Sequence, residues 1–549
     1  MRRSANSADL LFIHILPFAR INFTMKKSAA RRTAKGDVDM NFEFKKEELS
    51  SLKCAFSSAA EQSVDFELNL PDYCSDIKRI LKCNVLAFVN SLRRTGNTVT
   101  ASGEIVVRLV YVGADEKIDC YEQKSELSKT FELKDLPENA VLTCNCDTEY
   151  INCRAASQRR FSVNGSVSVV FKGYCLEKTG LISQIEQSGA QTLREEAEVS
   201  NVIAVGEKCF DMSETASLEQ DKEPIGKIIR SDAFASLESA KAVSGKLLVK
   251  GEFVTEVVYC ADSSDGKTQT LRHSMPISQI IELPDISENS ECTVSLSVRS
   301  LSLQPRSDSS GSNRLLEIAA KVCAFVKATE EKKIGVVTDC YSTRCALKGE
   351  YSFVELNKKV CNFDVNETFQ KTVELSGQSA KSIIDARCVK TSCSVTASGE
   401  KAELHLDILA GIIFSDNDGN VQYAEKNLTF TTERRAKEKI TKIGCEPLVT
   451  IERTEGTALG GEKIRLSFFV RGNFDVFSAE QKRICMAASE DENSKMPENG
   501  ALIIYYSKKG EKLWDIAKRY GSTLKAISEE NEVSGDTLED DKMLMIPCV

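Results

Sequence analysis

The residue types that most often carry out catalysis are scarce in this 549-residue chain. It holds three histidines, His14, His273 and His405, which lie far apart in the sequence. It has no glycine loop of the phosphate-binding type, no Gly-x-Ser-x-Gly nucleophile elbow and no His-Glu-x-x-His helix. The sequence therefore favours a binding or structural protein over an enzyme, and we predict no catalytic residue, cofactor or metal.

Cysteine is the other chemically active residue type, with 20 copies spread from Cys54 to Cys548. The closest cluster is Cys144, Cys146 and Cys153, but a structural zinc site needs four ligands and no partner pair or Cys-x-x-Cys is present. We predict buried, reduced thiols that act as small apolar residues. Oxidative cross-links and metal binding are the alternatives.

Composition narrows the class of protein further. The net charge of −9 and a pI near 5.4 disfavour a nucleic-acid partner. An apolar fraction of 42% and a charged fraction of 28% are typical of folded domains, and the length suggests three or four of them. No segment is apolar and long enough to predict a transmembrane helix.

The first 40 residues differ from the rest. The apolar run at 10–18 is short and interrupted by His14 and Pro17, and a basic stretch follows from Met25. We expect a disordered leader, or sequence upstream of a true start at Met25 or Met40. A signal peptide and a basic, membrane-touching tail are the alternatives.

Internal repeats organise the middle of the chain. The sequence Val-Thr-Ala-Ser-Gly-Glu occurs at 99–104 and again at 395–400, and Gly103, Gly251 and Gly399 follow each other at steps of 148 residues. A second marker, at 76–82 and 224–230, keeps the same step and is missing from the third copy. We predict three modules of similar design, of which the third has diverged.

The sequence of each repeat predicts mainly β-strands. The segments at 105–112 and 253–259 are apolar on both faces, which predicts strands between two layers, whereas 402–409 alternates apolar and polar residues. Turn signals follow at Ala114-Asp115, Asp265-Gly266 and Asp418-Gly419. A brief helix is expected near 191–199. The predicted fold class is mainly β, with three sandwich-like modules.

These repeats resemble the SPOCS family, the spore coat assembly domain of endospore-forming Firmicutes. The likeness rests on the 76–82 and 224–230 markers, on the Gly-Glu that precedes the main strand, and on the strand ends at Tyr111 and Tyr259. It covers about residues 60–480, well for the first two repeats and partly for the third. The resemblance implies no catalytic residues.

The last fifty residues predict a small βααβ module. Leu513, Ile516, Ala517 and Tyr520 fall on one helical face, and Gly521 can close that helix in the left-handed conformation. Thr523 can cap a second helix, which has Leu524 and Ile527 on its inner side. The segments 503–506 and 543–546 are the two expected strands.

This module resembles the LysM family through Lys508-Lys509-Gly510, Leu513-Trp514, Tyr520-Gly521, Asn531 and Ile546-Pro547. The resemblance implies a shallow glycan groove between the loop leading into the first helix and the loop after the second. Its expected residues here are Gly510, Glu511, Lys512, Leu513, Asn531, Glu532 and Val533. We expect the single tryptophan, Trp514, to belong to the packing of the module rather than to a sugar platform.

Two departures from the LysM pattern bear on its ligand. Lys512 stands where the family has a capping threonine and cannot accept the backbone hydrogen bond. Glu539, Asp540 and Asp541 replace the usual Pro-Gly before the last strand, which makes that edge acidic. We predict either a solvated face or a partner-docking rim at Asp540 and Asp541, and expect that reversing both charges weakens docking without unfolding the module.

The predicted organisation is a leader at 1–40, modules at 41–190, 191–335 and 336–478, an acidic flexible linker at 479–500, and the LysM-like module at 501–549. The combination resembles clostridial coat morphogenetic proteins, which join the coat to the forespore through the basement-layer coat ATPase. The resemblance implies a spore coat assembly protein in the mother-cell cytoplasm, at the forespore surface, with coat proteins as partners. The alternative is a protein that binds peptidoglycan (N-acetylglucosamine glycan) or cortex.

Overall fold

The computed structural model describes residues 43–134, 136–263, 267–444, 448–491 and 502–548. The predicted leader at 1–40 and the turn at Asp265-Gly266 lie outside these residues. Within the described segments, no helix is both long and apolar enough to cross a membrane.

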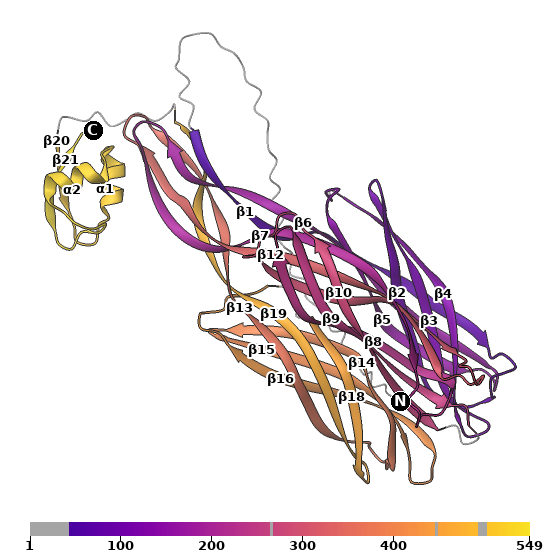
Figure 1. The fold of residues 1–549 in the computed structure, drawn as a ribbon. Coiled ribbons are helices and arrows are strands. Elements are labelled where there is room, and N and C mark those ends of the chain that lie inside the picture. Colours follow the sequence, from indigo (N-terminus) through magenta and orange to yellow (C-terminus); the bar gives the residue numbers. More distant parts are fainter. Residues whose placement is uncertain (1–42, 135, 264–266, 445–447, 492–501, 549) are drawn as a thin grey trace, which may run out of the picture. The chain divides into compact units, whose positions relative to one another are not determined.

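The strands fall into three sets with one plan, which we call modules 1, 2 and 3 (Figure 1). In each module a long first strand pairs antiparallel with a long last strand, which also pairs with the strand or strands before it. Three middle strands form a second antiparallel sheet.

Module 1 comprises Glu43–Asn69 (β1), Ile77–Thr95 (β2), Thr98–Gly113 (β3), Ile118–Glu132 (β4), Val141–Ala155 (β5) and Arg160–Glu186 (β6). Module 2 comprises Ala190–Ser217 (β7), Ile225–Val243 (β8), Lys246–Ala261 (β9), Thr268–Glu282 (β10), Glu291–Arg306 (β11) and Leu315–Ser342 (β12). Module 3 comprises Leu347–Glu374 (β13), Ser382–Ser398 (β14), Lys401–Ser415 (β15), Val421–Arg435 (β16), Lys442–Ile443 (β17), Leu448–Gly460 (β18) and Lys463–Glu490 (β19).

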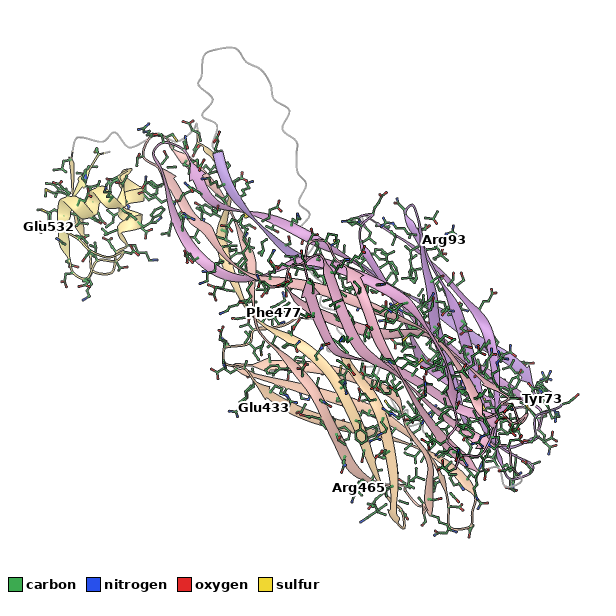
Figure 2. The ribbon with its side chains drawn as sticks, in the orientation of Figure 1. Tyr73, Arg93, Glu433, Arg465, Phe477 and Glu532 are labelled. Atoms are coloured by element: carbon green, nitrogen blue, oxygen red, sulfur yellow. A yellow bond between two sulfur atoms is a disulfide. The ribbon has the colours of Figure 1, made fainter. Side chains whose placement is uncertain are left out.

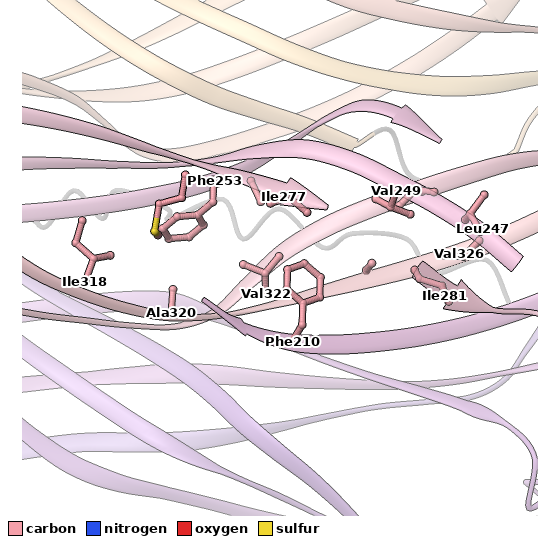
Figure 3. Close-up of a cluster of buried hydrophobic side chains, with 14 of the residues drawn as sticks. Phe210, Leu247, Val249, Phe253, Ile277, Ile281, Ile318, Ala320, Val322 and Val326 are labelled. Carbon is pink, nitrogen blue, oxygen red and sulfur yellow. The ribbon is translucent and has the colours of Figure 1, made fainter. Parts of the chain in front are cut away.

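Each module is a sandwich with its own core between the two sheets. Figure 3 shows the hydrophobic core of module 2, where Phe210 and Val322 from one sheet lie near Phe253 and Ile281 from the other. Apolar side chains that alternate along each strand fill this space, since successive residues point to opposite faces. The prediction of a mainly β fold with sandwich-like modules is confirmed.

The central strands of the middle sheets are buried on both faces, as their sequence predicts. In β3, every residue from Ile105 to Val112 is buried. One face lies in the module core, and the other belongs to a shared cluster that includes Val110 of module 1, Val258 of module 2 and Ile413 of module 3. The three modules therefore pack against one another through these sheets.

Three predicted boundaries fall inside strands. The limit at 190/191 lies one residue into β7, which begins at Ala190. The limit at 335/336 lies within β12, which runs to Ser342, and the limit at 478/479 lies within β19, which runs to Glu490. The strand sets accordingly span 43–186, 190–342 and 347–490. Residues 479–490 of the predicted linker are strand, and 492–500 lie outside the described residues. Antiparallel pairing with β13 extends this polar segment, a long-range interaction that local composition does not reveal.

The prediction of a helix near 191–199 is wrong, because this segment is the start of β7 and pairs with the end of β12. Its glutamates favour a helix locally, but Lys332–Gly335 of β12 pair with Glu196–Val199 and hold the segment as a strand. Tertiary pairing overrides the local preference.

The proposed equivalence of Gly399 with Gly103 and Gly251 is also wrong. Gly103 and Gly251 lie within β3 and β9, opposite bulges of the neighbouring strand, where a Cβ would meet a backbone oxygen at 1.8 and 2.3 Å. Gly399 instead has φ of +63° in the turn between β14 and β15, which is where Gly96 and Gly245 lie in the other modules. In module 3, β14 and β15 pair without a bulge at the corresponding position. The backbone therefore leaves room for a side chain, and Leu406 stands where the other two modules have a glycine.

The six long strands continue past the sandwich cores and pack together. We call their packed ends, residues 43–52, 176–186, 190–202, 329–342, 347–356 and 480–490, the neck. Its core draws on all six strands, through Leu49, Leu181, Val199, Ile334, Val336, Leu356 and Ile484. An isolated two-stranded ribbon is marginally stable in water, so three ribbons must bury their apolar faces on one another.

Ion pairs join each module to both of the others. Lys227 of module 2 contacts Asp119 of module 1 (2.5 Å), and Arg230 of module 2 forms a two-point pair with Asp385 of module 3 (3.0 Å). Lys82 of module 1 forms an ion pair with Glu425 of module 3. The planar guanidinium of Arg230 matches a carboxylate at two points and thereby fixes its orientation.

Asp475 of β19 is the most buried of these interface charges, with 2% of its surface exposed. Lys327 of module 2 and Lys359 of module 3 each approach its carboxylate to 3.1 Å, and Asn362 donates at 2.9 Å. Burial alone raises the pKa of Asp475, but the two ammonium groups outweigh it and lower the pKa to about 2.

We predict that Asp475→Ala lowers the free energy of unfolding by about 3–5 kcal/mol, because it leaves two largely buried lysines without their shared counter-ion. Chemical denaturation followed by circular dichroism measures this. Asp364→Ala, at an exposed position on β13, is the matched control and should change the value by less than about 0.5 kcal/mol. Equal effects of the two substitutions would contradict the role of Asp475.

The carboxylate of Asp475 also makes the stability of the folded protein sensitive to acid. Its pKa is lower in the folded protein than the usual value of about 3.9, so its stabilisation is complete above about pH 4 and is lost as the pH falls towards 2. The acid-induced loss of stability in this window should be smaller in Asp475→Ala than in the wild type. Identical acid profiles would contradict this assignment.

The cysteines follow the prediction only in part. Cys74, Cys83, Cys144, Cys340, Cys345 and Cys485 are buried free thiols. Cys209 and Cys323, however, face each other across β7 and β12 and form a disulfide. Among the described residues, the one group with metal-ligand spacing is Glu207 with these two cysteines, whose sulfurs are bonded to each other.

Candidate functional site

The C-terminal module has the predicted order of two strands around two helices. It consists of Leu502–Ser507 (β20), Leu513–Tyr520 (α1), Leu524–Asn531 (α2) and Lys542–Pro547 (β21), and the two strands pair antiparallel. Leu513, Ile516, Ala517 and Ile527 form its core with Leu544 and Ile546, so the helices cover one face of the two-stranded sheet.

The helix ends are closed as the sequence predicts. Gly521 adopts the left-handed conformation at the end of α1 (φ +63°), and the Thr523 side chain accepts the amide hydrogen bond of Ala526 at the start of α2. The Lys512 side chain gives α1 no cap, and the backbone provides the alternative: the Leu513 amide donates to the Asp536 carbonyl (2.9 Å).

The two loops predicted to wall the groove are joined by backbone hydrogen bonds. Besides the bond from Leu513, the Gly510 amide donates to the Leu538 carbonyl (2.8 Å) and the Leu538 amide donates to the Glu511 carbonyl (3.0 Å). A β-bridge pairs Lys512 with Thr537. The structure therefore brings 510–513 next to 536–538, in the loop between α2 and β21.

Several predicted groove side chains already have internal partners. The Glu511 carboxylate accepts hydrogen bonds from the Lys508 amide and the Tyr505 hydroxyl. The Asn531 amide group donates to the carbonyls of Ile527 and Met545 and accepts from the Met545 amide, which fixes β21 against α2. Leu513 is buried. A role in ligand binding for this set stays a prediction.

Gly510, Lys512 and Glu532 are exposed, and Val533 is half-buried. Figure 2 shows Glu532 at the surface of the module, where it ends α2 in the left-handed conformation (φ +50°). These positions leave backbone and charged groups accessible, but they do not form an apolar platform of the kind that a sugar ring stacks on.

The two rim aspartates have different surroundings. Asp541 accepts a hydrogen bond from the Lys509 amide (2.8 Å) and thereby holds the loop that leads into α1. Asp540 is exposed, as are Asp536 and Glu539. Reversal of Asp541 would disturb the loop itself, so Asp540 is the cleaner position for testing the acidic rim.

An apolar surface that was not predicted lies on the side of β20 and β21 that faces away from the helices. Ile504 and Tyr506 are 58% and 76% exposed, and Leu502 and Met543 share the same face. We call these four residues the outer face. The signal was present in the sequence: Leu502 to Tyr506 has no polar residue at the alternate positions that a solvated strand face requires.

Trp514 belongs to an intramolecular contact that the sequence did not predict. Its indole N–H donates to Asp339 Oδ2 (2.8 Å), and Lys518 Nζ contacts the same carboxylate at 2.6 Å. Tyr341 lies edge-on to the indole at 4.9 Å between ring centroids and donates its hydroxyl to the Ser522 carbonyl. We call Asp339 and Tyr341, both at the end of β12, the seat.

The seat is electrostatically adapted to this contact. Burial alone raises the pKa of Asp339, but hydrogen bonds from Lys518, Trp514 and Tyr351 outweigh it and hold the pKa below its usual range. Through these contacts the module lies on the neck. Trp514 contributes to packing, as expected, but also to this contact between segments 175 residues apart.

Comparisons with known proteins agree with the two resemblances. Residues 76–156 and 224–305 match the model of the SipL, SPOCS domain, and residues 508–547 match that of the LysM domain. No curated protein and no solved structure gave a significant match. The chain thus combines two SPOCS regions, in modules 1 and 2, with a C-terminal LysM domain.

Both matched types are non-catalytic binding domains. Together they support a sporulation-related protein that carries a module of the carbohydrate-binding LysM type. Module 3 has the same strand plan as modules 1 and 2, but neither SPOCS match extends to it. Its shifted register and its different glycine positions explain why a sequence pattern is weaker there.

Because Trp514 is the single tryptophan, its fluorescence reports the seat directly. We predict that Asp339→Ala shifts the emission to longer wavelength, since the indole loses its acceptor and becomes accessible to water. Glu331→Ala, at an exposed position on the same strand, is the control and should leave the spectrum unchanged. Emission that is identical in wild type and Asp339→Ala would show that the module does not occupy the seat in solution.

Proposed function

We propose that this protein is a non-enzymatic spore coat or envelope assembly protein, which tethers coat layers to the forespore through protein–protein contacts of its LysM module. The three packed modules act as the scaffold, and the module at 502–548 is the recruiting element. The proposed site of action is the mother-cell cytoplasm, at the forespore surface. The proposed partners are the basement-layer coat ATPase and other coat proteins.

The observation that carries this proposal is the contrast between the groove and the outer face. Glu511 and Asn531, the polar side chains expected to contact a glycan, are engaged in internal hydrogen bonds. The outer face, by contrast, exposes Ile504, Tyr506 and Met543 on one small sheet. Aromatic and aliphatic side chains of this kind are typical anchors of protein interfaces.

The acidic rim supports a protein partner as well. Asp536, Glu539 and Asp540 are exposed on the loop before β21, whose Met543 is part of the outer face. An apolar patch with charge at its edge is the usual anatomy of a protein interface. Peptidoglycan is itself often anionic, so the same charges disfavour it electrostatically.

Glycan binding is the competing function, and one feature favours it. Gly510 has φ of +88° and open space around its α-carbon, so the backbone of the groove loop is accessible to a ligand. Backbone donors and acceptors alone can bind sugar hydroxyls and N-acetyl groups. In that case the protein would be a peptidoglycan- or cortex-binding protein.

The deciding experiment compares two ligands with the full-length protein: the purified basement-layer coat ATPase and insoluble peptidoglycan. We predict that Ile504→Glu weakens binding to the ATPase at least tenfold, because it places a charge in the apolar centre of the interface, and that Asp540→Lys weakens it to a smaller extent. Leu459→Glu, at an exposed apolar position of module 3, is the matched control and should bind like the wild type.

Binding to the ATPase that is unchanged by Ile504→Glu would contradict the outer face as the recruiting surface. Sedimentation on peptidoglycan without ATPase binding would replace the proposed function by the glycan-binding one. Circular dichroism of each variant confirms that the module is folded before binding is compared.

A further inference from the structure

Two free thiols from different modules face each other inside the neck. Cys340 lies near the end of β12 and Cys485 near the end of β19, and their sulfur atoms are 3.8 Å apart. The two residues are 145 positions apart in the sequence, and they belong to strands that do not pair with each other. Both are buried, with 2% and 0% of their surfaces exposed.

Backbone bulges set this arrangement. The ladder between β12 and β7 shifts its register next to Asp339, and the ladder between β13 and β19 shifts next to Cys485. A bulge leaves one residue unpaired and re-aims the side chains beside it. The bulges also interrupt the backbone hydrogen bonding around the two thiols, so this part of the neck opens at lower cost than a regular ladder.

The surroundings of Cys340 favour its reactive form. The Cys485 thiol hydrogen-bonds to the Cys340 sulfur. This bond, against the effect of burial, lowers the pKa of the Cys340 thiol to about 7. The pKa of Cys485 is raised. The thiolate is the nucleophile in thiol oxidation, so Cys340 is the sulfur that reacts first.

We propose that Cys340 and Cys485 are a redox site that forms a disulfide between modules 2 and 3 when the protein meets a peroxide. The Cys340 thiolate attacks one peroxide oxygen, the O–O bond breaks, and hydroxide leaves to take up a proton as water. Cys485 then attacks the resulting sulfenic acid, the S–O bond breaks, and a second water leaves with the proton of Cys485. In sum, two thiols and one hydrogen peroxide give one disulfide and two waters.

The position of this site gives the disulfide a consequence. Cys340 lies between Asp339 and Tyr341, the two residues of the seat, and the Tyr351 hydroxyl donates its hydrogen to Asp339 (2.7 Å). A bond to Cys485 therefore fixes the seat to β19. It also closes a loop of 145 residues that contains most of module 3, which restricts the unfolded chain. To form the bond, the sulfurs must approach from 3.8 Å to about 2.05 Å, the length of a disulfide bond.

The test uses the full-length wild-type protein, treated with hydrogen peroxide and then with N-ethylmaleimide under denaturing conditions, followed by trypsin and mass spectrometry. Trypsin isolates Cys340 in 334–344 and Cys485 in 484–495, each without another cysteine. We expect these two peptides to be linked after peroxide and separate after dithiothreitol. The exposed thiol of Cys54 shows that the peroxide dose oxidises an accessible cysteine.

A Cys485→Ser variant tests the order of the steps. It removes the resolving thiol, so the sulfenic acid at Cys340 should accumulate and be captured by dimedone in the 334–344 peptide. Maleimide on both Cys340 and Cys485 in the wild type, at a dose that oxidises Cys54, would overturn the proposal. Linkage of either residue to a different cysteine would overturn it as well. The wild-type result decides the question even if the variant fails to fold.

Discussion

The apolar packing of six strand ends in the neck is the constraint on which the rest of the structure depends. Each ribbon alone would expose one apolar face, and none has a second layer of its own there. Packing the three ribbons together brings Leu49, Ile334 and Ile484 into one core, although they come from three modules. The same arrangement sets the middle sheets against one another around Val110, Val258 and Ile413. The modules are therefore parts of one folding unit, and the ion pairs at Asp385 and Asp475 select their relative orientation.

Divergence between the repeats, rather than their similarity, creates the single seat. The bulges near the ends of β6, β12 and β19 occupy corresponding positions, so Asp339 corresponds to Gln184 in module 1 and to Ala487 in module 3. Only the module 2 residue can accept hydrogen bonds from Trp514 and Lys518 as a carboxylate. An architecture of three similar modules thus presents one attachment point for one LysM module, and it leaves the outer face of that module exposed.

Local patterns predicted what depends on local interactions. The sequence predicted the helix ends at Gly521 and Thr523, the strand buried on both faces at 105–112 and the alternation at 402–409. Each of these features reflects a period or a cap within a few residues. The sequence did not predict the extent of β12 and β19, the strand at 191–199 or the role of Gly399, because long-range pairing and register determine them. For the candidate site, the family pattern located the groove loops, but the bonds that occupy Glu511 and Asn531 and the contact with Asp339 depend on tertiary structure.

Differential scanning calorimetry of the full-length protein shows whether the three modules are one folding unit. If the neck and the shared interface make modules 1, 2 and 3 interdependent, their β structure unfolds in one cooperative transition, with the calorimetric enthalpy equal to the van't Hoff enthalpy. The small LysM domain is free to contribute a separate, minor transition. Three resolved transitions of similar enthalpy would mean that the modules fold independently, and would contradict the conclusion that packing in the neck makes them a single scaffold.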